Sequence, residues 1–159
     1  GGTFEHSRII HNLNGLMFNA LRGSNCRGNN SDIRIEVTKS HYVYPDFTVV
    51  CGEPEFNEEK PNNLTNPTMV VEVISDSSED RDRYTKFNLY RSIPSLKIYL
   101  IIEQKRASAT LYVRHEDGWF LRFYNGLEAV IPLNDIHAEL KLSELYETIE
   151  FPDAEPDDL

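Results

Sequence analysis

Two short runs of almost unbroken apolar residues constrain the fold of this chain more than any other feature of its sequence. Met69–Ile74 and residues 98–102 each have the length and composition of a strand that is buried on both faces of a sheet. Between them, residues from about 79 to 91 are predicted to form a helix, packed onto the sheet by Tyr84, Phe87 and Tyr90. The order strand, helix, strand favours a parallel crossover, so the chain is predicted to be an α/β protein.

Weaker signals on either side extend this α/β prediction. Apolar residues recur at helical spacing over residues 5–21, and Thr3 is a plausible N-cap. Strands are predicted over 33–37 and 42–50, and because Pro45 cannot donate to a ladder, the second strand should have an edge, a bulge or an opening there. A C-terminal antiparallel extension follows, with strands over 109–113, 119–124 and 129–133 and a short helix over 143–146. The predicted fold is a mixed central sheet flanked by helices.

The charge of the chain is strongly acidic but unevenly distributed. Its 159 residues include 16 Lys and Arg against 26 Asp and Glu, a formal net charge of −10, which argues against a generic basic nucleic-acid coat. However, five acidic residues and no basic ones lie in 150–159, expected to be a disordered tail after a single domain over 3–149. Residues 81–106 contain seven bases against two acids. Acidity therefore predicts weak, metal-dependent binding of nucleic acid rather than none.

Several classes of protein are disfavoured by what the sequence lacks. Cys26 and Cys51 are too few for a disulfide framework and favour a reducing, cytoplasmic environment. The sequence contains no run of about 18 apolar residues, so no membrane partner is expected. No secretory signal opens the chain. Histidines and cysteines at zinc-ligand spacing, a phosphate-binding glycine loop and a nucleophile elbow are all missing. We therefore expect neither a zinc site nor an organic cofactor.

Glu72 needs an explanation because it is a carboxylate inside the apolar run Met69–Ile74. An ionised carboxylate in a buried strand is costly unless it is paired or bound to a metal. Asp46 follows Pro45 on the preceding predicted strand, so the two carboxylates can converge at one end of the sheet if these strands are neighbours. Paired carboxylates suit a hard divalent cation such as Mg²⁺ or Mn²⁺, which would neutralise charge in a phosphoryl transfer reaction while a nearby lysine stabilised the same charge.

Four short segments carry a resemblance to a known family as a set, although no single one would do so. They are Tyr44-Pro45-Asp46, Val71-Glu72-Val73-Ile74-Ser75, Asp82-Arg83-Tyr84-Thr85-Lys86-Phe87 and Ile93-Pro94-Ser95-Leu96. Together they resemble the Uma-type family of restriction-endonuclease-like proteins, within the PD-(D/E)XK nuclease superfamily. The resemblance covers most of the chain, from residue 2 to about residue 146.

The resemblance implies a restriction-endonuclease-like core that acts as a metal-dependent DNA endonuclease on phosphodiester bonds. Asp46 and Glu72 would be ligands of Mg²⁺ or Mn²⁺, with the carbonyl of Val73 able to add a third ligand. The superfamily's lysine normally lies two residues after the second acid, where this chain has Ile74. Within the family that role moves to the following helix, which implies that Lys86 positions the attacking water. Cleavage of both DNA strands would require two sites, so a homodimer is plausible.

Simpler explanations of these residues stay open. Asp46 could be an ordinary strand-end residue, and Glu72 could form a structural ion pair with Arg83 or Lys86. Lys86 could instead pair with Asp82 on a solvated helix face. At the start of the first predicted helix, His6 is more readily explained by a capping or surface role.

Two further departures from the family pattern bear on function. Asp76 replaces a usual proline and adds charge, and Tyr84 stands where glycine is common and could narrow the approach to the site. Together with Ile74 and the overall acidity, Asp76 supports an alternative function, a catalytically inactive nuclease-fold module that binds protein or nucleic acid. A weaker alternative is a metal-dependent phosphoesterase acting on nucleotides.

Overall fold

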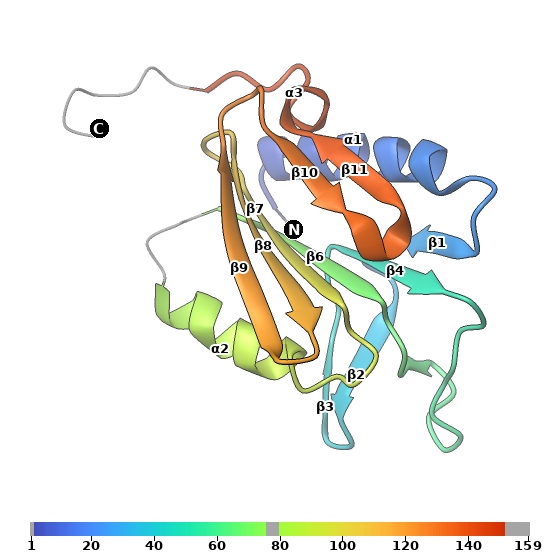
Figure 1. Ribbon diagram of the computed structural model, residues 1–159. Coiled ribbons are helices and arrows are strands. Elements are labelled where there is room, and N and C mark those ends of the chain that lie inside the picture. Colours follow the sequence, from blue (N-terminus) through green and yellow to red (C-terminus); the bar gives the residue numbers. More distant parts are fainter. Residues whose placement is uncertain (1, 76–79, 152–159) are drawn as a thin grey trace.

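A six-stranded mixed sheet forms the centre of the computed structural model, which describes residues 2–75 and 80–151, the side chains of 80–82 excepted (Figure 1). Its strands are β1 (Cys26–Asn29), β4 (Phe47–Cys51), β6 (Met69–Ile74), β7 (Ile98–Glu103), β8 (Ser108–His115) and β9 (Gly118–Asn125), in that spatial order. β6 and β7 run parallel, and the other neighbouring pairs are antiparallel. The connection from β6 to β7, which contains α2, is therefore a parallel crossover.

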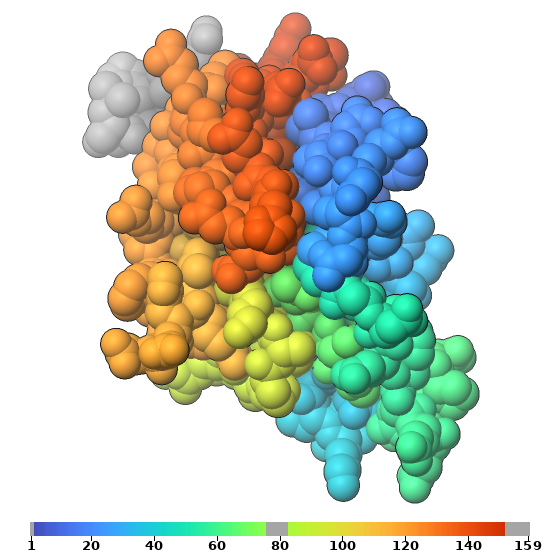
Figure 2. All heavy atoms as spheres, turned by 45° about the vertical axis from the view of Figure 1, so that its right-hand side comes forward, coloured from blue at the N-terminus to red at the C-terminus, as the bar shows by residue number. Residues whose placement is uncertain are grey.

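Each face of this sheet is covered by a separate group of elements (Figure 1). One face carries α1 (Phe4–Leu21), the hairpin of β10 (Val130–Leu133) and β11 (Ala138–Lys141) joined by the 3-10 turn Asn134–Ile136, and α3 (Leu142–Leu145). α1 and this C-terminal hairpin lie side by side at the surface (Figure 2). The other face carries α2 (Asp80–Tyr90) and a small sheet of β3 (His41–Val43), β2 (Arg34–Thr38) and β5 (Asn63–Leu64).

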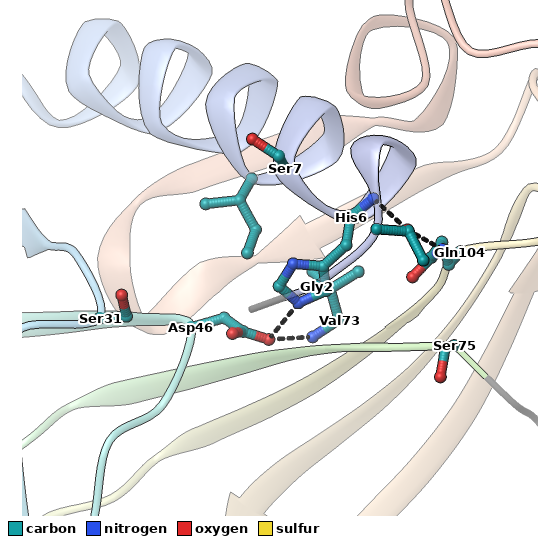
Figure 3. A pocket seen from close by; sticks show the side chains of 10 residues that line it. Gly2, His6, Ser7, Ser31, Asp46, Val73, Ser75 and Gln104 are labelled. Atoms are coloured by element: carbon teal, nitrogen blue, oxygen red, sulfur yellow. Dashed lines mark hydrogen bonds and ion pairs between the residues drawn. The ribbon is translucent and has the colours of Figure 1, made fainter.

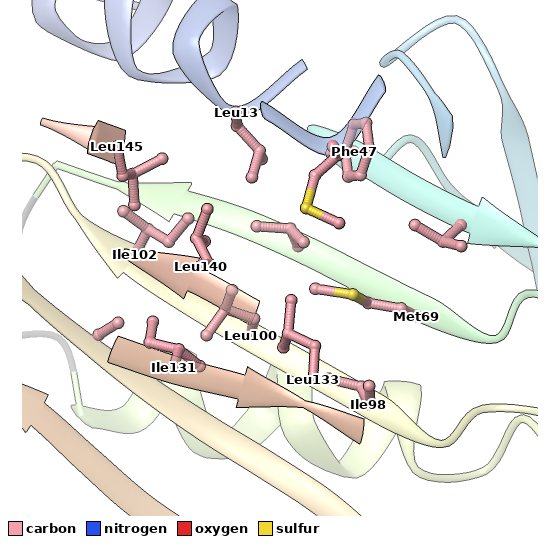
Figure 4. Close-up of a cluster of buried hydrophobic side chains, with 14 of the residues drawn as sticks. Leu13, Phe47, Met69, Ile98, Leu100, Ile102, Ile131, Leu133, Leu140 and Leu145 are labelled. Carbon is pink, nitrogen blue, oxygen red and sulfur yellow. The ribbon is translucent and has the colours of Figure 1, made fainter. Parts of the chain in front are cut away.

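β6 is buried on both faces because its alternate side chains enter two different cores. Met69, Val71 and Val73 pack with α1 and the C-terminal hairpin, a cluster that also includes Leu100 of β7 (Figure 4). Val70 packs into the second core, on the side of α2. Side chains of a strand alternate between faces, so a strand covered on both sides must be apolar throughout. Glu72 therefore lies in one of the most deeply buried strands of the fold.

The predicted α/β fold, with its parallel crossover and its C-terminal antiparallel extension, is confirmed. The strand predicted over 42–50 is wrong as a single element, since β3 and β4 belong to different sheets and separate at Pro45. β1, β5 and β11 were not predicted; β1 and β11 have four residues each, with few of them apolar, and β5 has two. Tyr84 was expected to pack α2 onto the sheet, but 68% of its surface is exposed.

Cys26 and Cys51 form a disulfide bond, which corrects the expectation that they stay reduced. The two residues lie directly opposite each other in the antiparallel pair β1–β4. The bond therefore ties the edge strand β1 to β4, the strand that begins beside Asp46. Sequence reasoning missed the bond because it did not predict β1 and so could not place the two cysteines opposite each other.

Two further expectations stay predictions. The cytoplasmic location is not tested by the fold, although no helix among the described residues is long and apolar enough to cross a membrane. The division into a domain over 3–149 and an acidic tail over 150–159 also stays a prediction, because residues 152–159 lie outside those that the structure describes.

Reducing the Cys26–Cys51 disulfide should lower the free energy of unfolding by roughly 3 kcal/mol, since the bond joins residues 25 apart and restricts the unfolded chain. Urea denaturation with and without a phosphine reductant measures this difference. The double variant Cys26→Ser/Cys51→Ser is the control and should not respond to the reductant. The prediction would be contradicted if the native protein had the same free energy of unfolding with and without the reductant. Two titratable thiols in the untreated protein would show that the bond is absent.

Candidate active site

Asp46 lies where β4 separates from β6, and this opening in the ladder builds the site. The antiparallel register of β4 and β6, continued by one residue, places Asp46 opposite Glu72. The next residue of the chain in that direction is Pro45, which has no N–H to donate. Side chains replace the missing ladder bonds: Asp46 Oδ2 accepts a hydrogen bond from the N–H of Val73 at 2.8 Å, and the N–H of Asp46 donates to Glu72 Oε1 at 3.2 Å.

Glu72 is buried and forms an ion pair with Lys86. Only 8% of its surface is exposed, and the Nζ of Lys86 donates to Glu72 Oε2 at 2.9 Å. Burial raises the pKa of the Glu72 carboxyl above its ordinary value, while the charge and hydrogen bond of Lys86 act in the opposite direction. The neighbouring charge of Asp46 raises the pKa further.

Aromatic side chains account for the burial on the side of Glu72 that faces α2. Phe87 stacks on Tyr112 with ring centroids 4.3 Å apart, and Tyr90 packs on Tyr99 at 4.8 Å. Burial raises the pKa of both Tyr90 and Tyr99, and the next largest cause in each case is the charge of Glu72. These rings pack over the strand that carries Glu72 and shield it from water. The prediction that Phe87 and Tyr90 pack α2 onto the sheet is confirmed.

His6 approaches Asp46 from the opposite face of the sheet (Figure 3). Its Nε2 lies 3.4 Å from Asp46 Oδ2, an ion-pair contact longer than an ordinary hydrogen bond. The predicted N-cap is confirmed, because Thr3 Oγ1 accepts from the N–H of His6. The surface role expected for His6 is wrong, however: it continues the buried stripe of Ile9 and Leu13 toward the start of α1. That spacing was the signal that sequence reasoning overlooked.

A cavity of about 880 Å³ opens beside His6 and gives access to Asp46 (Figure 3). Its walls combine hydroxyl, amide, imidazole and carboxylate groups with about as much apolar surface. Its lining residues are Gly2, Thr3, His6, Ser7, Ile10, Ser31, Asp46, Val73, Ser75 and Gln104. The cavity is therefore on the α1 side of Asp46, whereas Lys86 meets Glu72 from α2.

The structure thus brings together Asp46, Glu72, Val73 and Lys86, the four residues singled out in the sequence. Of the simpler explanations, the ion pair between Glu72 and Lys86 is present, whereas Arg83 pairs with another carboxylate, Glu103. The alternative pairing of Lys86 with Asp82, and the position of Asp76, lie outside the described side chains. The catalytic and metal-binding roles of these four residues stay predictions.

The donor set suits a hard divalent cation that keeps most of its water. Within residues 2–75 and 80–151, no three His, Cys, Asp or Glu side chains are grouped so as to enclose a metal ion. A cation here would have two carboxylates as its protein side-chain ligands, which is the usual way in which Mg²⁺ binds together with water and phosphate oxygens. Asp46 Oδ2 already accepts two contacts, and no hydrogen bond from the described residues reaches its Oδ1. The donor types therefore suit the predicted ion, while both oxygens of Glu72 already accept hydrogen bonds, from the N–H of Asp46 and from Lys86.

Comparison with known proteins identifies the fold and the family of this chain. A crystal structure titled as a "putative nuclease belonging to DUF820", from Anabaena variabilis, superposes with a TM-score of 0.71 over 91% of this chain and 82% of the other, at 15% identity. The similarity shows that the two proteins share a fold. In sequence, this chain is 33% identical over 153 residues to the uncharacterised Synechocystis protein slr1290, covering 95% of this chain and 79% of that protein. A second Synechocystis protein, sll1609, is 35% identical over 105 residues, and the match spans 59% of its length.

The chain belongs to the Uma2 family. The model of that family, described as "Putative restriction endonuclease", matches residues 1–144. The resemblance inferred from the four segments around Asp46, Glu72, Lys86 and Pro94 is therefore confirmed, and it covers nearly all of the part of the chain that folds around the site.

Replacing Glu72 by glutamine should stabilise the metal-free protein at neutral pH relative to the native chain. A carboxyl whose folded pKa is raised favours the folded state below its ordinary pKa of 4.5, and this contribution is lost as pH rises through the folded pKa. The free energy of unfolding of the native protein should fall by about 1.4 kcal/mol for each pH unit by which the folded pKa of Glu72 exceeds its ordinary value. That of Glu72→Gln should not fall in this way. Chemical denaturation in a chelator between pH 4 and pH 8 measures both.

Lys86→Met provides the matched comparison, because it leaves the carboxylate buried without its cation. Its stability should decrease more steeply over the same pH range than that of the native protein. If Glu72→Gln is instead less stable than the native chain by a constant amount at every pH, burial does not dominate the titration of Glu72.

Proposed function

We propose that this protein is a metal-dependent endonuclease that hydrolyses phosphodiester bonds of DNA. The observation that carries the proposal is the placement of Asp46 opposite Glu72 at one end of the sheet, with Lys86 2.9 Å from Glu72. Membership of a family of restriction-endonuclease-like proteins supports it. A site of this kind needs no organic cofactor, since a divalent cation, a lysine and water supply the groups that phosphodiester hydrolysis requires.

Each residue would have a separate task. Asp46 and Glu72 would hold Mg²⁺ or Mn²⁺, and the carbonyl of Val73 would add a ligand. The cation, when bound, supplies a Lewis acid that lowers the pKa of a water and neutralises charge on the phosphate. Lys86 would orient that water and stabilise the same charge through its ammonium group. His6 would restrain the orientation of Asp46 from the α1 side.

The acidity of the chain limits what binding the surface can provide. A cation between Asp46 and Glu72 would remove the local repulsion between the site and a phosphate. Contacts to the DNA backbone would come from the segment 81–106, where the bases outnumber the acids. A monomer with one site would nick one strand, so cleavage of both strands would require a homodimer. The proposed location for this activity is the cytoplasm.

A catalytically inactive nuclease-fold module that binds protein or nucleic acid is the second candidate. Ile74 at the superfamily's lysine position favours it, and so does the ion pair with Glu72 that already engages Lys86. In this case the buried acid–lysine pair would be only a structural feature. A phosphoesterase acting on nucleotides is a third candidate and would share the same residues.

Incubation of the purified protein with supercoiled plasmid DNA should produce nicked circles in Mg²⁺ or Mn²⁺ and none in a chelator. Asp46→Asn removes a metal ligand, and Lys86→Met removes the cation that stabilises charge on the reacting phosphate, so each should reduce the rate by about 100-fold or more. Lys141→Met, which replaces an exposed lysine on β11 on the other face of the sheet, is the matched control and should retain full activity.

Three outcomes separate the candidates. Cutting that is lost in both site variants supports the endonuclease. Absence of cutting in all metals, together with unchanged metal and DNA binding by Glu72→Ala, contradicts it and leaves the inactive module. Hydrolysis of short model phosphodiesters without any cutting of plasmid would favour the nucleotide phosphoesterase.

A further inference from the structure

Glu103 is a buried carboxylate that the proposed chemistry does not use. It ends β7, only 6% of its surface is exposed, and it lies opposite Ile74 in the register with β6. Its side chain is on the α2 face, because Tyr99 and Ile101, at two-residue spacing before it, both belong to the core on that face. A carboxylate buried in this way requires compensation by positive charge.

Two arginines meet this single carboxylate. The Nε of Arg106 donates to Glu103 Oε1 at 3.2 Å, and a terminal nitrogen of Arg83 lies 3.6 Å from the same oxygen. One cation would be enough to neutralise one acid, so the group of three carries a net positive charge. The side chain of Arg106 is 66% exposed. A guanidinium has five N–H donors, and contact with one carboxylate oxygen leaves several of them directed at solvent.

This cluster lies beside the candidate active site. Arg83 and Lys86 are three residues apart on α2 and so lie on the same side of the helix, where they meet Glu103 and Glu72 of adjacent strands. The two acids lie on adjacent strands and are offset by two residues, which places their Cα atoms roughly 8 Å apart. A nucleic-acid strand that crosses the ends of β6 and β7 would meet both groups.

We propose that Arg83 and Arg106, held in place by Glu103, bind a backbone phosphate of the nucleic acid next to the cleavage site. Guanidinium groups bind phosphate through paired N–H donors, and Glu103 fixes the orientation of the two forks before the ligand arrives. The subsite explains how an acidic protein offers a local cationic surface to a polyanion. The identity of the ligand rests on the proposed function. The alternative role for the two arginines is to neutralise Glu103 alone.

The test measures binding of a fluorescein-labelled DNA duplex by anisotropy between 50 and 200 mM salt, in an Asp46→Asn background so that the DNA stays intact. Arg106→Gln should weaken binding by about tenfold and reduce the slope of log affinity against log salt by about 1. Arg106→Lys keeps the charge and should restore the slope but only part of the affinity. Arg122→Gln, an exposed arginine on β9 opposite Leu111 of the α1-side core, is the control and should change neither value.

If Arg106→Gln behaves like Arg122→Gln, the arginines only neutralise Glu103 and the subsite is wrong. Because Arg106 is exposed, its variant should fold even if Arg83→Gln does not, and thermal melting checks this. Plasmid cutting by the native protein together with unchanged DNA binding by Arg106→Gln overturns the subsite alone. A native protein that neither binds nor cuts DNA overturns the proposed function and the subsite with it.

Discussion

The exchange of hydrogen bonds between Asp46 and β6 is the interaction on which the candidate site depends. Pro45 interrupts the ladder at this point. The carboxylate of Asp46 accepts a hydrogen bond from the N–H of Val73, and the N–H of Asp46 donates a hydrogen bond to the carboxylate of Glu72. Each acid is thus fixed by the backbone next to the other. Like charges on opposed residues of neighbouring strands destabilise a sheet, so this arrangement is stable only with positive charge nearby.

Positive charge reaches the end of the sheet from one helix. α2 places Lys86 at Glu72 and Arg83 at Glu103, so two neighbouring strands each receive a cation from the same side of the helix. The aromatic packing of Phe87 and Tyr90 onto the sheet holds α2 at the distance these contacts need. Removing the aromatic layer would therefore affect the electrostatics of the site as well as the core. On the other face, His6 of α1 approaches the same carboxylate of Asp46.

Most of the fold could be predicted from the sequence, because its strongest signals are local. The apolar runs of β6 and β7 and the helical stretch between them determine the parallel crossover. The convergence of Asp46 and Glu72 could be predicted on the condition that their two strands are neighbours, and the family resemblance singled out the same pair. What could not be predicted depends on contacts between distant segments. The Cys26–Cys51 bond requires the four-residue strand β1, and the contact of His6 with Asp46 joins residues 40 apart in the chain.

The most direct test of the account is the location of a divalent cation in crystals soaked with Mn²⁺, detected by its anomalous scattering. The account predicts one strong peak at about 2.1 Å from a carboxylate oxygen of Asp46 and from one of Glu72. That position would place the ion between the two strands and next to Lys86. A peak elsewhere, or none while Glu72 keeps its contact with Lys86, would contradict the claim that these two acids form a metal site.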